Sequence, residues 1–391
     1  MKDSDLADPD TYTHGPPHEL FTALRRDDPV HRVESTSCAP FWAVLTHSDV
    51  ETVKRQPTLF SSAAAGVMLE DLAAAQLDQM RGMLLAMDPP RHREVRKPLT
   101  PRFTPRAMAR LESDIREICR ATFDELAGQV DLVASVSGRL PSQVIGAMMG
   151  LPRADWERIH TLAERITHGQ DPDYAASEGA AGEASAEMGM YAYELAVARG
   201  ESDTTGDVTS VLLSFLSPVD YATLFVQLVT AGQDTTQTML SSGVHALLTH
   251  PDELALLRAD RSLIPSAVEE ILRWANPLHY FRRTATADTV LHDVPIAAGD
   301  KVAMFYTSAN RDDAVFPDPQ CFDVRRSPNR HLSFGQGEHF CLGVHLARLE
   351  GRVFFEELLD AYSSMEPAGE PRRLRSNLVN GYKALPVDLR H

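Results

Sequence analysis

The chain has 391 residues, of which 43% are hydrophobic and 24% are charged, and its formal net charge is −17. This composition predicts a globular protein with a sizeable core, and the negative charge argues against nucleic acid as a general partner. No apolar run reaches the roughly 18 residues of a membrane span, and the acidic start MKDSDLADPDTY predicts neither a signal peptide nor a membrane anchor. Four scattered cysteines without paired spacing fit a reducing cytoplasm.

The first part of the chain is predicted to mix strands with helices. Residues 31–33 and 41–46 have the composition of two short strands joined as a hairpin. We expect β-rich parts at roughly 28–60 and 284–306, together with a C-terminal hairpin, and helices over the remainder.

A basic segment from Arg91 to Arg110 runs against the overall acidity, because it holds seven basic residues and one acid, a local charge of +6. It is either a solvated helix face or a docking surface for an acidic partner. The helix expected here would place His92 and Arg96 on one face, where they could clamp a carboxylate. Arg283 and His339 are further candidates for the same task.

Residues 168–187 (HGQDPDYAASEGAAGEASAE) are small and polar, with several glycines. They fit a linker between domains and equally a mobile lid over a pocket, because few large apolar side chains could anchor them.

The clearest helix begins at Ser217-Pro218-Val219-Asp220, a capping box with proline at the first helical position, and can continue to about His250. Roughly 32 residues at ~1.5 Å each give about 48 Å, enough to cross the molecule. A second helix is expected between Pro265 and Asn276, residues 290–306 read as strands around a turn at 298–300, and 308–330 read as an irregular meander.

The centre of the long helix contains the stretch Ala231-Gly232-Gln233-Asp234-Thr235-Thr236. Glycine and threonine are poor helix formers, so the stretch predicts a distortion that frees a backbone carbonyl. The alternative is a small-residue crossing point with another helix. The acid–alcohol pair Asp234-Thr235 favours a site of proton delivery.

Glu270 and Arg273 lie three residues apart on one helical face. Together with Arg326 from the meander they would form a buried ionic network, in which the loss of one member leaves a costly unpaired charge. We interpret this network as architecture that holds the following cysteine turn, without a direct part in chemistry.

The stretch SFGQGEHFCLGVHLAR, residues 333–348, places Cys341 between a glycine-rich turn and an amphipathic helix. Gly335, Gly337 and Gly343 allow a bulky group to approach the backbone. The amide groups and the positive dipole at a helix start favour a thiolate, which suits a metal ligand or a nucleophile. A zinc site with His339 would lack two further ligands at suitable spacing.

Taken together, these motifs resemble the cytochrome P450 superfamily in its soluble bacterial form. FGQGEHFCLG is similar to the family's haem-binding signature, AGQDTT to its oxygen-activating helix, EEILR to its glutamate-x-x-arginine motif and DPPRHREVR to its proximal helix. ANRDDAVFPDPQCFDVRR resembles the family's meander, and the order of the motifs agrees over nearly the whole chain. The resemblance implies a mainly α fold with small β-sheets (α+β), in a single haem-enclosing domain over residues 1–391.

The resemblance also implies roles for individual residues. Cys341 would be the thiolate ligand of the iron in one haem b per chain, O2 would be the co-substrate, and Asp234 and Thr235 would be the catalytic relay pair. The other cofactor-binding residues would be His92, Arg96, Arg283 and His339 at the haem propionates, with Phe334, Ala231 and Gly232. Glu270, Arg273 and Arg326 would be the structural triad. The implied substrate pocket consists of Val67, Met68, Leu69, Leu224, Leu228, Leu278, Tyr280, Phe281 and Val379.

The implied reaction is monooxygenation, as hydroxylation or epoxidation, of a lipophilic or medium-sized organic substrate such as an intermediate of secondary metabolism. Electrons would come from a separate acidic ferredoxin and its NAD(P)H reductase, docking near Arg93, Lys97 and Arg102. We expect a monomer without nucleic acid or membrane partners. Two alternatives stay open: a peroxide-dependent haem-thiolate enzyme, which needs no Asp234-Thr235 relay, and a haem-binding sensor or carrier without turnover.

Overall fold

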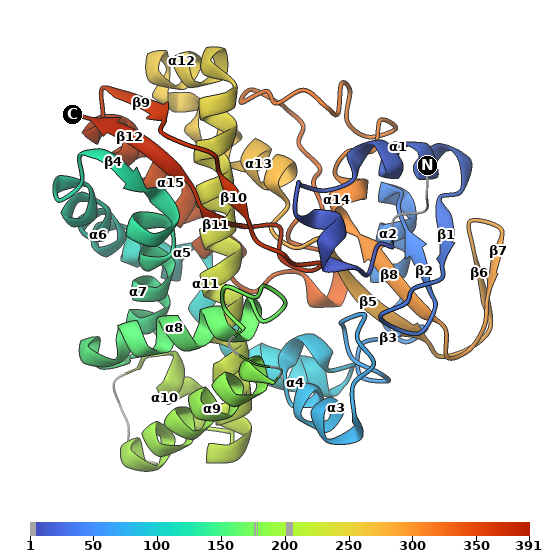
Figure 1. Ribbon diagram of the computed structural model, residues 1–391. Helices are drawn as coiled ribbons and strands as arrows, with labels where there is room; N and C mark the ends of the chain where they lie inside the picture. The colour runs from blue at the N-terminus through green and yellow to red at the C-terminus, as the bar shows by residue number, and fades with distance from the viewer. Residues whose placement is uncertain (1–4, 176, 178, 201–205) are drawn as a thin grey trace.

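The computed structural model describes residues 5–175, 177, 179–200 and 206–391, and it is mainly helical with small β-sheets (Figure 1). Helix α11 (Pro218–Thr249) runs through the middle of the molecule. Its start is the predicted cap, because the Ser217 hydroxyl accepts a hydrogen bond from the Asp220 amide at 3.2 Å and proline occupies the first turn. No helix among the described residues is both long and apolar enough to cross a bilayer.

The predicted distortion at the centre of α11 does not interrupt the helix, which is continuous through residues 231–236. The Thr235 hydroxyl donates to the Ala231 carbonyl at 2.8 Å, so the threonine is accommodated inside the helical ladder. A Cβ atom on Gly232 would lie 3.2 Å from the Ile145 side chain. Gly232 therefore supports the alternative interpretation of this stretch, in which small residues allow a close crossing with the helix that carries Ile145.

Five helices make the most extensive contacts with α11. They are α7 (Arg139–Met148), α8 (Trp156–Thr167), α9 (Ala180–Arg199), α13 (Ile264–Ala275) and α15 (Val344–Ala361). Helix α13 ends as predicted, because Asn276 adopts a left-handed φ of 41° and Pro277 follows it. The other α-helices are α1 (His18–Asp27), α2 (His47–Lys54), α3 (Ala74–Arg81), α4 (Arg91–Leu99), α5 (Pro105–Met108), α6 (Glu112–Asp124), α10 (Val208–Leu213), α12 (Pro251–Ala259) and α14 (Tyr306–Ala309).

The largest sheet joins strands from distant parts of the chain in the order β1-β2-β8-β5-β3. Strands β1 (Val30–Val33) and β2 (Phe41–Val44) form the predicted hairpin. Strand β8 (Lys301–Phe305) pairs in parallel with β2, so that Phe41 lies opposite Lys301. The sheet is completed by β5 (Tyr280–Ala285) and β3 (Phe60–Ser61).

The remaining strands form small separate sheets (Figure 1). They are β4 (Gly128–Asp131) with β12 (Pro386–Arg390) and β9 (Ser364–Pro367), β10 (Arg372–Arg373) with β11 (Tyr382–Ala384), and β6 (Thr289–Leu291) with β7 (Val294–Ile296). The β6–β7 hairpin corrects the predicted strand pattern, because it has its own turn at His292 and Asp293, both with positive φ. The turn at 298–300 lies between β7 and β8.

The segment 168–187 connects α8 to α9, which already begins at Ala180. Residues 176 and 178 of this segment lie outside the described residues. The first half is tied to the C-terminal hairpin and to the N-terminal segment: the Lys383 amine donates to the Asp171 carboxylate at 3.0 Å, and Arg375 bonds both the Gln170 carbonyl and Asp10. The first half of the segment is therefore fastened to parts of the chain near both of its ends.

Candidate functional site

A cavity lies between the middle of α11 and the loop that precedes α15. Its lining includes nine of the ten residues predicted to be catalytic or cofactor-binding, from segments far apart in the chain: His92, Arg96, Ala231, Gly232, Thr235, Arg283, Phe334, His339 and Cys341. The tenth, Asp234, lies on the other side of α11 and is outside the lining. The fold thus gathers the predicted residues around one space.

The cysteine loop is a tight turn that depends on two glycines. Gly335 and Gly337 have φ values of 66° and 69°, in the left-handed region. A Cβ atom on Gly337 would lie 2.6 Å from the Lys54 carbonyl oxygen, so the loop and the end of α2 touch through backbone. The Cys341 amide donates to the Phe334 carbonyl at 2.9 Å, which closes the turn.

Cys341 stands three residues ahead of α15, whose N-cap is Gly343. Burial raises the pKa of the Cys341 thiol, and the Gly343 amide and the Arg96 charge offset this only in part. The Gly343 amide at the start of α15 therefore favours the thiolate, as the sequence predicted, but burial outweighs it. A buried thiol of this kind becomes a thiolate when it binds a metal ion, because binding releases the proton.

Basic side chains, buried or half-buried, line part of the cavity wall. They are His92, Arg96, Arg283 and His339, which were predicted, and Lys54 at the end of α2, which was not. No carboxylate among the described residues forms an ion pair with Lys54, Arg96 or Arg283. Unpaired buried cations are costly, so this part of the wall suits a ligand that carries carboxylates.

Burial and mutual repulsion control the charge of these groups. Burial, followed by repulsion from Arg283, lowers the pKa of His339 to about 2. Burial likewise holds the pKa of Lys54 well below its ordinary value, although the side chain faces Tyr306, with Nζ 5.4 Å from the ring centroid. A bound dianion would reverse both effects by supplying the missing negative charge.

Arg93 was expected to be free to contact a partner protein, but it is paired with Glu338. Its guanidinium donates two hydrogen bonds to the Glu338 carboxylate, at 2.6 and 3.0 Å, while the side chain stays 68% exposed. Glu338 also lies 3.5 Å from Nδ1 of His92. Lys97 and Arg102 are exposed and form no ion pair within the described parts of the chain.

The acid–alcohol pair points to two sides of α11. Thr235 lines the cavity, whereas Asp234 faces α8 and is 3% exposed. Burial raises the pKa of Asp234 to about 8, so the carboxyl group holds a proton near neutral pH. Nε2 of His168 lies 3.6 Å from Oδ1 of Asp234.

The rest of the cavity wall is largely apolar. Of the predicted pocket residues it contains Val67, Leu228, Leu278 and Phe281. It also contains apolar residues that were not predicted, among them Leu84, Leu85, Phe103, Ile145, Met149, Met239, Leu272 and Pro277.

The other predicted pocket residues lie outside this wall: Met68, Leu69, Leu224, Tyr280 and Val379. Tyr280 precedes Phe281 in β5 and so points to the opposite face of the sheet, where it packs against Phe305 and its hydroxyl accepts from the Leu69 amide at 3.2 Å. Leu224 is 1% exposed and belongs to the helical core.

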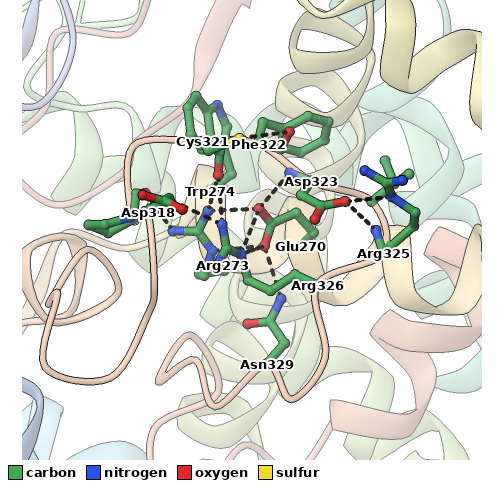
Figure 2. A network of polar contacts seen from close by, with 12 residues as sticks. Glu270, Arg273, Trp274, Asp318, Cys321, Phe322, Asp323, Arg325, Arg326 and Asn329 are labelled. Carbon is green, nitrogen blue, oxygen red and sulfur yellow. Dashed lines mark hydrogen bonds and ion pairs between the residues drawn. The ribbon is translucent and has the colours of Figure 1, made fainter.

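A buried ionic network fastens α13 to the meander (Figure 2). The Glu270 carboxylate accepts two hydrogen bonds from Arg273, at 2.8 and 2.7 Å, and two from Arg326, at 3.2 and 3.1 Å. Asn329 and the Asp323 amide add one each at 3.0 Å. The three predicted members are therefore in contact, and Arg273 also bonds the carbonyl of Cys321.

Comparison with known proteins agrees with this geometry. The family model described as Cytochrome P450 matches residues 212–380. A methyl-branched lipid omega-hydroxylase of Mycobacterium tuberculosis is 38% identical over 94% of this chain and 90% of its own length. A steroid C26-monooxygenase of Mycolicibacterium smegmatis is 35% identical over 95% of this chain and 90% of its own length. Among solved structures, a Mycobacterium marinum cytochrome P450 in complex with pseudoionone is 36% identical, with a TM-score of 0.90 over 95% of this chain and 94% of that chain.

Proposed function

The chain belongs to the cytochrome P450 family and is a haem-dependent monooxygenase, and we propose that it inserts one oxygen atom of O2 into a lipophilic organic substrate. The proposal rests on one cavity, whose lining brings together Cys341, Thr235, a group of basic side chains and an apolar wall. We infer that residues 1–391 act as one haem-enclosing domain.

The residues of the cavity fit haem b. Cys341 would hold the iron, and Lys54, His92, Arg96, Arg283 and His339 would hold the two propionates. Gly335 and Gly337 allow the loop to pack against Lys54 at the end of α2, and the Gly343 amide hydrogen-bonds the Cys341 sulfur. When bound, the haem supplies oxygen activation, which thiolate ligation favours.

The two residues of the acid–alcohol pair take complementary tasks. Thr235 presents its hydroxyl at the cavity surface, beside the Ala231 carbonyl that it bonds. Asp234, behind it, stores a proton on its carboxyl group and can deliver it toward the cavity side of α11. The apolar wall excludes bulk water, so protons reach the reaction through this pair.

The substrate is proposed to be an extended apolar molecule of the lipid or steroid class. The wall offers side chains such as Leu85, Ile145, Leu228 and Phe281, and apolar lining favours apolar ligands. Two of the most similar relatives are named for action on a methyl-branched lipid and on a steroid.

Electrons are proposed to come from a separate acidic ferredoxin and its reductase, which dock on a monomer near Lys97, Arg102 and the Arg93–Glu338 pair. The docking face is the one that carries α4, whose residues His92 and Arg96 turn inward to the cavity.

The test is a titration of the ferric protein with a library of fatty acyl compounds and steroids. A substrate should shift the Soret band, and its turnover under 18O2 with ferredoxin and reductase should give a product that contains one 18O atom. If no apolar compound moves the Soret band, or the product draws its oxygen from water, the proposal is wrong.

A further inference from the structure

A glutamine side chain belongs to the largely apolar part of the cavity wall. Gln227 on α11 lines the cavity together with apolar side chains such as Leu84, Ile145 and Leu228. Gln227 is 8% exposed, and its Oε1 atom is buried without a hydrogen-bond partner. Buried polar groups in proteins are normally bonded, so this carboxamide needs an explanation.

Gln227 lies on the face of α11 that also carries the predicted catalytic residue Thr235. Residues 227, 231 and 235 follow one another at intervals of four, and all three line the cavity. Leu224, one turn before Gln227, belongs to the helical core and is outside the lining. Gln227 is therefore at the start of the row of α11 residues that line the cavity. Thr235 lies eight residues further along, which is about 12 Å at ~1.5 Å per residue.

No hydrogen bond to the Gln227 carboxamide exists among the described residues. The turn of α11 before it is covered by Gly82, because a Cβ atom there would lie 2.9 Å from the methyl group of Thr223. The turn after it is covered by Ile145, which lies against Gly232. Neither a glycine nor an isoleucine offers a polar side-chain group, so the missing partner fits a molecule that occupies the cavity.

The carboxamide of Gln227 selects the chemistry of such a molecule. It carries an acceptor oxygen and a donor nitrogen, and its last torsion turns readily, so either atom can face a ligand. A hydroxyl group can donate to the oxygen or accept from the nitrogen. An ether or an ester can only accept, and an ionised carboxylate would be costly among apolar side chains. A hydroxyl group therefore suits this position best.

We propose that Gln227 determines specificity by holding a hydroxyl group of the substrate, and that the substrate is an extended lipophilic alcohol. The inference rests on the proposed monooxygenase function and narrows its substrate class. The hydroxyl group is held about 12 Å along α11 from Thr235, so the oxidised carbon lies near the other end of the molecule. One atom of O2 enters a C–H bond there and the other leaves as water, with two electrons from the ferredoxin and two protons from solvent. The product is a diol.

The first experiment compares three chains with the same number of heavy atoms: decan-1-ol, its isomer methyl nonyl ether, and undecane. Equilibrium dialysis of the 14C-labelled compounds against the haem-loaded protein gives each dissociation constant without a spectral change or turnover. The unaltered protein should bind the alcohol more tightly than the ether and the alkane. In Gln227→Leu the preference for the alcohol over the alkane should fall about tenfold, because a neutral hydrogen bond is lost.

Two further variants make this comparison specific. Gln227→Met keeps an unbranched side chain but lacks the carboxamide, so it should lose the preference as Gln227→Leu does. Leu228→Met changes the shape of the neighbouring wall without changing its polarity and should leave the preference in place. The inference is overturned if the preference is the same in Gln227→Leu, Gln227→Met and the unaltered protein, or if the ether binds as tightly as the alcohol.

The second experiment examines where decan-1-ol is oxidised. With ferredoxin and reductase, the unaltered protein should form mainly one diol, oxidised far from the first hydroxyl group, and Gln227→Leu should form a mixture of positional isomers. Gas chromatography with mass spectrometry separates these diols. The same distribution of isomers from both proteins contradicts the role of Gln227. Failure of the proposed function would show separately, as a missing Soret shift or a product without 18O, while the dialysis ratios remain measurable.

Discussion

The guanidinium of Arg93 is bound to the carboxylate of Glu338 by two hydrogen bonds, which join the start of α4 to the cysteine loop 245 residues away. Glu338 neutralises the positive charge of Arg93 on the face where a ferredoxin is proposed to dock. The free charge of that face therefore lies further along the segment, at Lys97 and Arg102.

Reversing charge at Lys97 and Arg102 together should slow reduction by an acidic ferredoxin by about tenfold or more at low salt, because steering acts on the association rate. The difference should shrink as salt shortens the Debye length to ~8 Å at physiological strength. Arg93→Gln should have a smaller effect, since its charge is already paired. Stopped-flow reduction measures all three, with Arg139→Glu on α7 and reduction by dithionite as controls. If the reduction rate depended on neither the substitutions nor the salt concentration, the basic segment 91–110 would be only a solvated helix face.

Cys341→His should abolish the long-wavelength absorption of the CO-bound reduced protein that is typical of thiolate ligation, while haem remains bound through the basic side chains of the cavity wall. Cys321→Ser, which alters a cysteine on the exposed meander, should keep the band. Persistence of the band in Cys341→Ala would show that another group holds the iron.

Lys54→Met should weaken haem binding, because a buried ammonium that faces the cavity loses its carboxylate partner. A hydrogen bond between charged groups contributes about 1.5–3 kcal/mol, so haem should leave roughly 10 to 100 times faster. Transfer of haem to apomyoglobin measures this rate. The control is Lys301→Met, which removes another buried lysine whose partner, Asp71, belongs to the chain. Equal release from both variants would exclude Lys54 from the propionate site.

Glu270→Gln should lower the free energy of unfolding by about 3–5 kcal/mol, because Arg273 then remains as an uncompensated buried cation. Both side chains are 0% exposed. Glu34→Gln removes an exposed partner of Arg32 and should cost less than about 1 kcal/mol. Urea unfolding of the haem-loaded proteins compares the two. A similar small loss in both would mean that the network adds nothing to stability.

Glu350 on α15 predicts a pH-dependent stability. Its side chain is 1% exposed, Oε2 has no hydrogen-bond partner, and burial raises the pKa to about 8. The folded protein therefore keeps a proton that the unfolded chain releases near pH 4, and stability falls as pH rises between these values, by up to ~1.4 kcal/mol per pH unit. Glu350→Gln should remove this fall, so its advantage over the unaltered protein should grow from pH 5 to 7.

Glu357, two turns further along α15, gives the matched control. Burial raises its pKa, but Arg120 and Arg116 lower it further, and the net pKa lies below the ordinary value. Its contribution to stability is complete above the unfolded pKa and is lost only as pH falls below it. Glu357→Gln should therefore change stability equally at pH 5 and 7. A constant difference for Glu350→Gln as well would show that Glu350 is ionised in the folded protein.

The sequence predicted elements whose ends are encoded locally. The cap at Ser217 and the Asn276-Pro277 pair located α11 and α13 because hydrogen bonds and backbone dihedrals within a few residues determine those ends. The cavity residues were predicted through the resemblance of short motifs, since no periodic pattern relates His92 to Arg283 or Cys341.

Contacts between segments far apart in the chain could not be predicted from the sequence. Lys54 ends an ordinary short helix, and only the contact of its backbone with Gly337 places it at the cavity. Tyr280 and Phe281 were both assigned to the pocket, although alternation along a strand allows only one of them to face it. The sequence around His160 and Glu164 did not predict that α8 lies against α11, because tertiary packing decides which helix it contacts.

The parallel pairing of β2 with β8 has a consequence for biosynthesis. Val44 leaves the ribosome long before Lys301, and at roughly 5–20 residues per second the delay is about 13 to 50 s. During that delay the edge of β2 that β8 later covers is unpaired, and such edges recruit strands of other chains. The yield of folded protein should therefore depend on elongation rate and on chaperone occupancy of the nascent chain, well before the haem cavity exists.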